Sequence, residues 1–333
     1  MAPDDSSPIS RLAFFKDDAP RVDDLRAAVM TGLARPQKSL PPKFFYDEAG
    51  AALFEAITDT EEYYLTRTEV RLLQEIGPEI ADLTGPQCVV VEPGGAASVK
   101  IRILLDHLAD PAGYVAIDIS RTHLIESAVR IAAAYPDIAV GAICADFAAM
   151  GGLPTAADMI GRRRLGFFPG STIGNFSPDQ AVAILKWFRT ITGPDGALLI
   201  GADTKKDIAV LDAAYNDKKG VTAAFNRNLL HRINRELHAN FDADSFDHVA
   251  FFNEHESRIE MHLRSRHAQR VTIDGHDFDF AADETIHTEN SYKYDRADFA
   301  ELAVRAGFRV ARHWTDPARL FSIYYLIGRD RPT

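Results

Sequence analysis

Apolar runs of strand length alternate with helical patterns through the middle of the chain. The runs cover residues 88–92, 114–119, 138–144, 165–168 and 197–201. Segments between them carry apolar residues at the spacing of one helix face, and Ser120 precedes one such segment as a predicted N-cap. Strands that are apolar throughout and alternate with helices predict an α/β protein whose parallel sheet is covered on both faces.

The pattern changes after Ala202. A long helical segment at 220–241 is followed by segments of alternating polarity at 248–253, 257–265 and 284–294. This order of a helix and then several strands predicts a separate α+β unit inserted after the parallel sheet.

The C-terminal part returns to the first pattern. A capped helix is predicted at 295–306, and two strands at 308–314 and 320–328 should add to the first sheet in antiparallel orientation. Ahead of the sheet, Thr66 and Glu69 have the spacing of a capping box, which predicts a helix start there.

Composition limits the class of protein. The chain has 333 residues, enough for about two domains, and 46% of them are hydrophobic. A net charge of -11 argues against nucleic-acid binding, which needs clustered Lys and Arg. The two cysteines, Cys88 and Cys144, lie in apolar runs and are expected to be buried thiols, with no metal site. The N-terminal sequence lacks the pattern of a secretory signal and no run has the length of a membrane span, so we expect a cytoplasmic protein without a membrane partner.

The stretch "VVVEPGGAAS" leads from a predicted buried strand into a glycine turn. In an open parallel sheet, ligands bind at the carboxyl ends of the strands. Glu92, Gly94 and Asp118 stand at such ends, and a carboxylate there can accept both hydroxyl groups of a ribose. Asp146 and Phe147, at the end of the third strand, are placed to meet an adenine amino group and ring. The alternative is tight turns with solvated carboxylates.

The phosphate-binding pattern G-x-G-x-x-G is absent, which disfavours a dinucleotide. A nucleoside without phosphates is left, and S-adenosylmethionine is the commonest cofactor of that kind.

A second group of candidates points to a substrate. Asn175 follows the fourth strand and offers both donors and an acceptor. In 284–294, simple alternation places Thr285, His287, Glu289, Ser291 and Lys293 on one face. A carboxylate and a hydroxyl two residues apart could hold the two nitrogens of an imidazole, and Met261 could wall a flat ring. The alternatives are an ordinary turn asparagine and ordinary strand residues.

Several longer stretches carry a resemblance to a known family. These are "EYYLTRTE", "GSTIGNF", "GVTAAFNRN", "RIEM" and "TENS". With them, nearly the whole chain from "KSLPPKFFYDEAGAALFEAIT" onward resembles the S-adenosylmethionine-dependent L-histidine Nα-methyltransferases of ergothioneine biosynthesis, the EgtD family. The resemblance implies a class I methyltransferase Rossmann-like sheet with an inserted α+β substrate-binding domain. It also implies conversion of histidine to hercynine, the first step of that pathway.

The resemblance implies site residues by position. The cofactor contacts fall on Gly94, Lys100, Asp118, Asp146 and Phe147, and the substrate contacts on Tyr63, Asn175, Tyr215, Met261, Glu289 and Ser291. In the family, Asn and Tyr side chains hold the backbone end of the amino acid, and Glu and Ser hold the imidazole. The implied domains are 65–203 with 293–333 for the cofactor, and 1–64 with 204–292 for the substrate.

One loop departs from the family pattern. Ala96 and Ala97 stand where family members usually carry a second glycine and then Ser or Thr. A methyl group at Ala96 would be strained if that position needs a positive φ. We expect cofactor binding to survive, because Lys100, Asp118 and Asp146 remain.

The expected reaction is direct displacement by the histidine α-amine, without a dedicated catalytic base, in an enzyme expected to be a monomer. One alternative keeps the chemistry and changes the substrate to another aromatic amino acid such as tryptophan. A second is an S-adenosylmethionine-binding protein without turnover.

Overall fold

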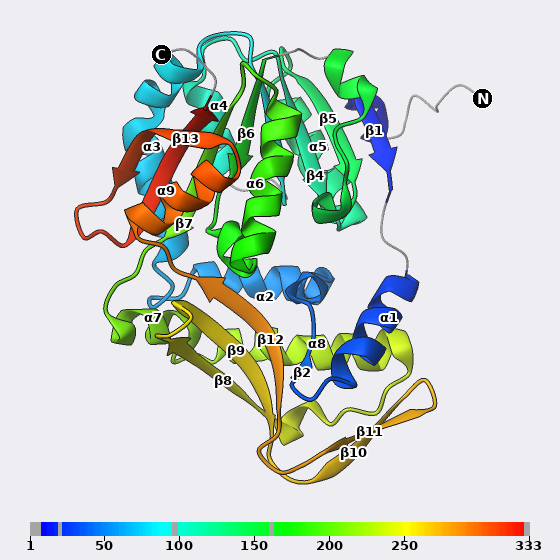
Figure 1. Ribbon diagram of the computed structural model, residues 1–333. Helices are drawn as coiled ribbons and strands as arrows, with labels where there is room; N and C mark the ends of the chain where they lie inside the picture. The colour runs from blue at the N-terminus through cyan, green and yellow to red at the C-terminus, as the bar shows by residue number, and fades with distance from the viewer. Residues whose placement is uncertain (1–7, 19–21, 95–98, 160–162, 330–333) are drawn as a thin grey trace. The chain divides into compact units, whose positions relative to one another are not determined.

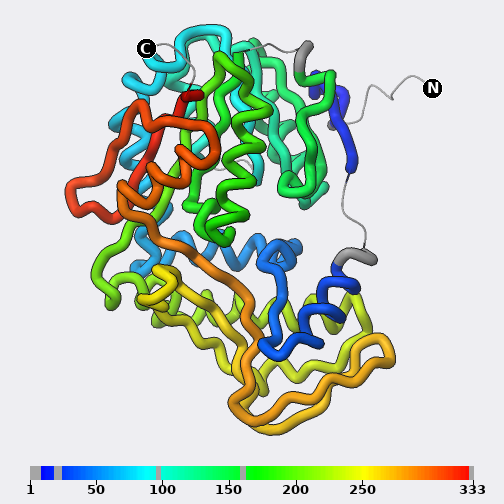
Figure 2. Tube along the Cα trace, in the orientation of Figure 1, coloured from blue at the N-terminus to red at the C-terminus, as the bar shows by residue number. Residues whose placement is uncertain are grey.

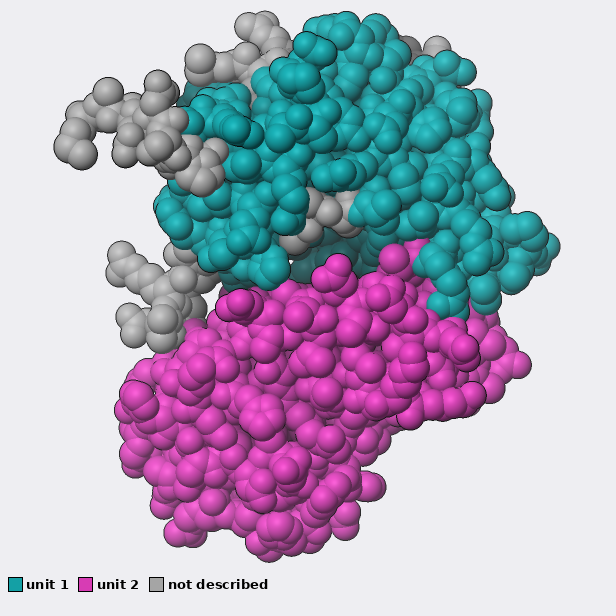
Figure 3. Space-filling view, turned by 180° about the vertical axis from the view of Figure 1, so that it is seen from behind, with its two compact units in different colours: residues 1–20, 67–204, 294–333 teal, residues 21–66, 205–293 magenta. Residues whose placement is uncertain are grey.

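The computed structural model describes residues 8–18, 22–94, 99–159 and 163–329. The chain divides into two compact units, shown in different colours in Figure 3. Unit 1 comprises Met1–Pro20, Arg67–Thr204 and Tyr294–Thr333, and unit 2 comprises Arg21–Thr66 and Lys205–Lys293. The chain therefore passes from unit 1 into unit 2 and back twice, and its course can be followed by residue number in Figure 2.

Unit 1 is built on one eight-stranded sheet (Figure 1). In spatial order its strands are β1 (Phe14–Asp17), β5 (Ala139–Cys144), β4 (Gly113–Asp118), β3 (Val89–Pro93), β6 (Arg164–Phe168), β7 (Ala197–Asp203), β14 (Phe321–Gly328) and β13 (Phe308–Thr315). The pairs from β1 to β7 are parallel, whereas β14 pairs antiparallel with both β7 and β13. The predicted α/β class, the parallel sheet and the two antiparallel C-terminal strands are confirmed.

Strand β1 corrects the predicted position of the N-terminal segment. Residues 14–17 were expected in the substrate-binding unit, but they pair in parallel with Gly141–Cys144 at the edge of the large sheet. Gly141 makes room for this strand, because an added Cβ there would lie 2.2 Å from the ring of Phe14.

Five long helices accompany this sheet: α3 (Leu65–Thr84), α4 (Val99–His107), α5 (Arg121–Ala134), α6 (Pro178–Thr192) and α9 (Arg296–Arg305). Unit 1 also contains the short 3-10 turns η1 (Pro8–Arg11), η3 (Phe147–Ala149), η4 (Thr155–Met159) and η5 (Thr172–Asn175). Ser120 is the N-cap residue of α5, as predicted, but its side chain makes no capping bond. The carboxylate of Asp118 instead accepts the Ser120 N–H at 2.7 Å.

Unit 2 combines a four-stranded sheet, a hairpin and helices. The sheet order is β2 (Lys38–Ser39), β12 (Thr285–Tyr292), β9 (Arg258–Ser265) and β8 (Phe246–Asn253), and the hairpin is β10 (Gln269–Ile273) with β11 (His276–Phe280). The helices are α1 (Val22–Leu33), α2 (Glu48–Thr58), α7 (Ile208–Tyr215) and α8 (Val221–Leu237), with 3-10 turns η2 (Pro42–Phe45) and η6 (Ala243–Ser245). The predicted α+β character of the inserted segment agrees with these elements.

Helix α8 covers one face of this sheet. Asn226 of α8 bonds His248 of β8 at 2.9 Å, and His248 stands opposite Leu263 of β9. Residues opposite each other in antiparallel strands share a face. We call this side, with Ile259, Met261 and Leu263, the α8 face.

A β-bulge in β12 decides which side chains reach the α8 face. His287 stands opposite His262, but Glu289 stands opposite Met261, so Thr288 is the extra residue. The Thr288 hydroxyl donates to Oδ1 of Asn226 at 2.8 Å and to the Met261 carbonyl at 3.0 Å.

The bulge corrects the predicted alternation. Glu289 and Ser291 lie on the α8 face, because their partners Met261 and Ile259 lie there. Thr285 and His287, which simple alternation placed beside Glu289, pair with Arg264 and His262 and lie on the opposite face.

Gly201→Ala tests the packing between β7 and α3. A Cβ at Gly201 would lie 2.1 Å from Oε1 of Glu69 and 2.9 Å from the ring of Phe321. We expect this overpacking to cost about 1–3 kcal/mol of unfolding free energy and to lower the melting temperature measured by calorimetry. Gly151→Ala, where a Cβ meets nothing within 4 Å, should melt like the wild type. Equal melting temperatures for both variants would contradict this packing.

Candidate active site

The chain leaves strand β3 through a left-handed glycine. Gly94 has φ +73° and donates its N–H to the Ile117 carbonyl at 2.7 Å. L-residues with a side chain rarely adopt this φ, so the turn depends on glycine. The following residues 95–98, which include Gly95, Ala96 and Ala97, lie outside the described residues, and so does the predicted strain at Ala96.

Two carboxylates end the neighbouring strands, and they differ in their surroundings. Asp118, at the end of β4, is partly exposed. Burial raises the pKa of Asp118, and the Ser120 N–H is the largest influence that opposes the shift. Glu92 is fully buried and accepts the Tyr114 hydroxyl at 2.7 Å, and burial raises its pKa to about 7. Of these two carboxylates, Asp118 is therefore the one that is open to a ligand.

Asp146 and Phe147 follow strand β5 at the same edge of the sheet. The Asp146 carboxylate caps the turn η3 by accepting the Ala148 N–H at 3.1 Å. The partly exposed Phe147 ring packs against Phe168, with ring centroids 5.8 Å apart, and against Trp187 at 6.1 Å. A flat aromatic surface thus lies next to a carboxylate.

Lys100, predicted as a cofactor contact, forms a buried ion pair. Its Nζ lies 2.6 Å from Oε2 of Glu69, and both residues are buried. The Glu69 carboxylate also accepts the Gly170 N–H, and the nitrogen lies 3.0 Å from Oε1 and 2.8 Å from Oε2. The helix predicted to start at Thr66 starts at Leu65, but the capping role predicted for Glu69 is wrong, because its carboxylate serves the ion pair and the turn after β6. Sequence reasoning missed Glu69 in this role.

The turn after β6 places Asn175. Ser171 adopts a left-handed conformation with φ 56°, and its hydroxyl accepts the Asp203 N–H at 2.9 Å. The chain then forms η5, at whose end Asn175 is partly exposed. The ion pair of Glu69 and Lys100 and the Ser171 bond thus hold the start of the loop that carries Asn175.

In unit 2, three polar side chains form a buried cluster on the α8 face, which we call the Lys293 cluster: Tyr215, Ser291 and Lys293. The Tyr215 hydroxyl donates to Oγ of Ser291 at 2.8 Å. The Lys293 Nζ donates to the same Oγ at 2.8 Å and to the Tyr215 hydroxyl at 3.1 Å. All three residues are buried.

The other predicted unit 2 residues adjoin the Lys293 cluster. The Tyr63 ring meets the Tyr215 ring edge-on, with centroids 6.4 Å apart. Glu289 is two residues before Ser291 on the same face, and Met261 lies opposite Glu289. Burial raises the Glu289 pKa to about 7, and the positive charge of Lys293 opposes the shift.

The structure thus gathers Tyr63, Tyr215, Met261, Glu289 and Ser291 in unit 2, and places Asn175 and the five predicted cofactor residues in unit 1. Lys293 was not among the site residues expected from the sequence. Its position in the alternating segment was the available signal, because it shares a face with Ser291.

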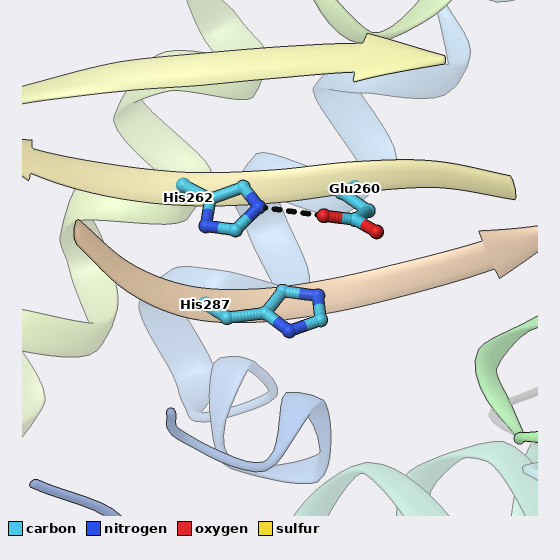
Figure 4. Close-up of side chains that lie close together, drawn as sticks. All are labelled: Glu260, His262 and His287. Atoms are coloured by element: carbon cyan, nitrogen blue, oxygen red, sulfur yellow. Dashed lines mark hydrogen bonds and ion pairs between the residues drawn. The ribbon is translucent and has the colours of Figure 1, made fainter. Parts of the chain in front are cut away.

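The opposite face of the unit 2 sheet carries Glu260, His262 and His287 (Figure 4). One ligand atom from each lies within 4.8 Å of the others, a spacing that could suggest a metal ion. The Glu260 carboxylate, however, accepts from His262 at 3.0 Å and pairs with Nη2 of Arg258 at 2.7 Å. Arg258, His262 and Asn253 together lower the Glu260 pKa to about 2, against the effect of burial.

The two histidine rings stack rather than converge. Their centroids are 4.7 Å apart and their planes differ by 16°, and the Phe251 ring stacks on the other side of His262 at 5.6 Å. Nitrogen lone pairs lie in the ring plane, so stacked rings do not aim them at an ion between the rings. We therefore assign this group a structural role in joining β8, β9 and β12.

Among the described helices, none is long and apolar enough to cross a membrane.

Comparison with known proteins gives consistent matches. The model of a family described as "Histidine-specific methyltransferase, SAM-dependent" matches residues 25–327. Histidine N-alpha-methyltransferase of Mycolicibacterium smegmatis is 42% identical over 305 residues, covering 90% of this chain and 93% of the relative. The protein of the same name from Mycobacterium tuberculosis is 42% identical over 306 residues, with the same shares covered. "Ergothioneine biosynthesis protein 1" of Neurospora crassa is 28% identical over 335 residues, covering 92% of this chain and 36% of the relative.

A double-variant cycle tests the buried pair of Glu69 and Lys100. Glu69→Gln leaves an ammonium buried without its counter-charge, and Lys100→Met leaves a carboxylate, so each should cost about 3–5 kcal/mol of unfolding free energy. The double variant removes both charges and should unfold at a denaturant concentration closer to that of the wild type than either single variant.

The exposed pair of Arg305 and Asp179, 2.8 Å apart, provides the control. Asp179→Asn should change stability by less than about 1 kcal/mol. Fully additive losses in the Glu69 and Lys100 double variant would contradict a direct interaction.

Proposed function

Because the chain belongs to the family of histidine-specific, S-adenosylmethionine-dependent methyltransferases, we propose that it methylates the α-amine of L-histidine. The match covers almost the whole chain and both units, and the sheet of unit 1 has the expected Rossmann-like organisation. The observation that carries the substrate assignment is the pair of Glu289 and Ser291 on one face, with Ser291 hydrogen-bonded to Tyr215 and Lys293. This pair offers polar partners to both nitrogens of an imidazole.

Unit 1 provides groups that fit S-adenosylmethionine. Gly94 allows close approach of the backbone, Asp118 offers a partly exposed carboxylate to ribose hydroxyls, and Phe147 with Asp146 offers a ring and an acceptor to adenine. Lys100 acts through Glu69 and the Gly170 turn in addition to any direct contact. When bound, S-adenosylmethionine supplies an activated methyl group and a neutral thioether leaving group.

The histidine amine forms the new N–C bond with its lone pair as the S–C bond breaks, and its extra proton passes to solvent. An α-amino group titrates near 8, so about a tenth is neutral at pH 7, at a cost of about 1.4 kcal/mol. Positioning can contribute about 7–11 kcal/mol, so we assign no dedicated base. Tyr63, Tyr215 and Asn175 are proposed to orient the amino acid, and tyrosine faces tolerate the growing cation.

We further propose that transfer continues to the trimethylated product, hercynine, and that the enzyme feeds ergothioneine formation, as the name of the Neurospora crassa relative suggests. The enzyme is proposed to act as a monomer in the cytoplasm. The named groups on one chain account for both ligands. Light scattering should then give a mass near 36.8 kDa.

The direct test of this function is an assay of the purified protein with S-adenosylmethionine and a panel of amino acids that includes histidine and tryptophan. Mass spectrometry should show histidine carrying one, two and then three methyl groups, with S-adenosylhomocysteine formed in equal amount. Turnover of tryptophan in preference to histidine would reject the substrate assignment. Cofactor binding without any methylated product would reject catalysis.

Glu289→Ala tests the assignment of the imidazole subsite. Removal of the carboxylate leaves a ring N–H without its acceptor, which costs on the order of 1–3 kcal/mol, so kcat/KM for histidine should fall about tenfold to hundredfold. Glu256→Ala, in the exposed turn between β8 and β9, is the control and should leave kcat/KM unchanged. The assignment fails if both variants use histidine as well as the wild type does.

A further inference from the structure

The Lys293 cluster has a defined hydrogen-bond direction. Lys293 is 1% exposed, so its ammonium group must be served by protein partners or bound ligand. An ammonium group has donors and no acceptor. The Ser291 hydroxyl, 2.8 Å away, and the Tyr215 hydroxyl, 3.1 Å away, therefore both accept from it.

The Tyr215 hydroxyl, which accepts from Lys293, in turn donates to Ser291. It donates its single proton to Oγ of Ser291 at 2.8 Å. Oγ of Ser291 thus accepts from both Tyr215 and Lys293, which uses the two lone pairs of a hydroxyl oxygen. Lys293 has no lone pair, and the Tyr215 proton already lies between the two hydroxyl oxygens, so neither neighbour accepts the Ser291 proton in return. That proton is left to be donated away from the cluster.

We propose that Lys293 is a positioning residue that makes Ser291 an obligate donor, so that Glu289 and Ser291 together select a ring with one N–H and one unprotonated nitrogen. Such a ring is the neutral imidazole. This inference rests on the proposed function and specifies the form of the substrate ring that the subsite accepts.

The two members of the pair complement that ring. A Glu289 carboxylate accepts the N–H, and the Ser291 proton goes to the other nitrogen. An imidazolium ring would turn a second N–H toward the Ser291 proton, and a ring with carbon at that position would leave the proton without an acceptor. Leaving a buried donor unsatisfied corresponds to a tenfold to hundredfold loss of affinity.

The test compares two ligands in several variants. Pyrrol-2-ylalanine and pyrrol-3-ylalanine each replace one ring nitrogen of histidine by C–H, so one of them keeps the N–H for Glu289 and removes the acceptor for Ser291. Dissociation constants are measured by calorimetry with S-adenosylhomocysteine present. For the wild type, histidine should bind at least about tenfold more tightly than the better pyrrole analogue.

The variants separate a positioning role from a structural one. We define the preference as the dissociation constant of the better pyrrole analogue divided by that of histidine. In Lys293→Met, Tyr215 becomes able to accept the Ser291 proton, so this ratio should fall several-fold toward one. In Tyr215→Phe, Ser291 still has no acceptor within the cluster, so the preference should stay near the wild-type value although both ligands bind more weakly. In Ser291→Ala the preference should disappear. A Lys293→Met protein that weakens both ligands equally would overturn the proposal.

A measurement on the wild type decides the matter if Lys293→Met does not fold. Histidine labelled with ¹⁵N in the ring is bound to the full chain, and the two nitrogen shifts are recorded at a pH where free histidine is largely imidazolium. One protonated and one unprotonated nitrogen are expected. Two protonated nitrogens would overturn the proposal.

Failure of the proposed function gives a different result. A wild type that methylates histidine but binds the pyrrole analogue equally well overturns this inference alone. A wild type that neither binds nor methylates histidine overturns the proposed function and this inference with it.

Discussion

A buried ammonium group fixes the direction of the hydrogen bonds in unit 2. Lys293 can only donate, and the two hydroxyls that it contacts, those of Tyr215 and Ser291, therefore accept from it. Its charge also opposes the effect of burial on the Glu289 pKa and so favours the carboxylate. One cation thus sets the polarity of both groups that would meet the substrate ring: Glu289 as acceptor and Ser291 as donor. The proposed recognition of histidine depends on this constraint.

The bulge at Thr288 determines which residues of β12 lie on the α8 face with Lys293. Without the extra residue, His287 and Glu289 would share a face, as simple alternation predicts. Thr288 bonds Asn226 of α8 and the Met261 carbonyl, so helix packing and strand register are set together. The sheet therefore separates a buried polar cluster on the α8 face from a structural group of Glu260, His262 and His287 on the other.

Local pattern predicted the elements well and their partners less well. The apolar run at 320–328 is readable as a strand because "LFSIYYLIG" is apolar and rich in β-formers, whereas β1 has only the four residues of "FFKD", whose pairing depends on the free edge of β5. Thr66 and Glu69 have capping spacing, but Lys100 and Gly170, distant in sequence, decide where the Glu69 carboxylate goes. Alternation predicted that Glu289 and Ser291 share a face. It could not predict the bulge, which needs α8, or the role of Lys293, which needs Tyr215.

Neutron diffraction from deuterated crystals of the protein without histidine tests the central claim most directly, because it locates the exchangeable hydrogen atoms. We expect Lys293 to carry three deuterons, two of them directed at Ser291 and Tyr215, and the Tyr215 deuteron to lie between the two hydroxyl oxygens. The Ser291 deuteron should point away from both neighbours. A Ser291 deuteron directed at Tyr215, or a Lys293 nitrogen that accepts a hydrogen bond, would contradict the claim.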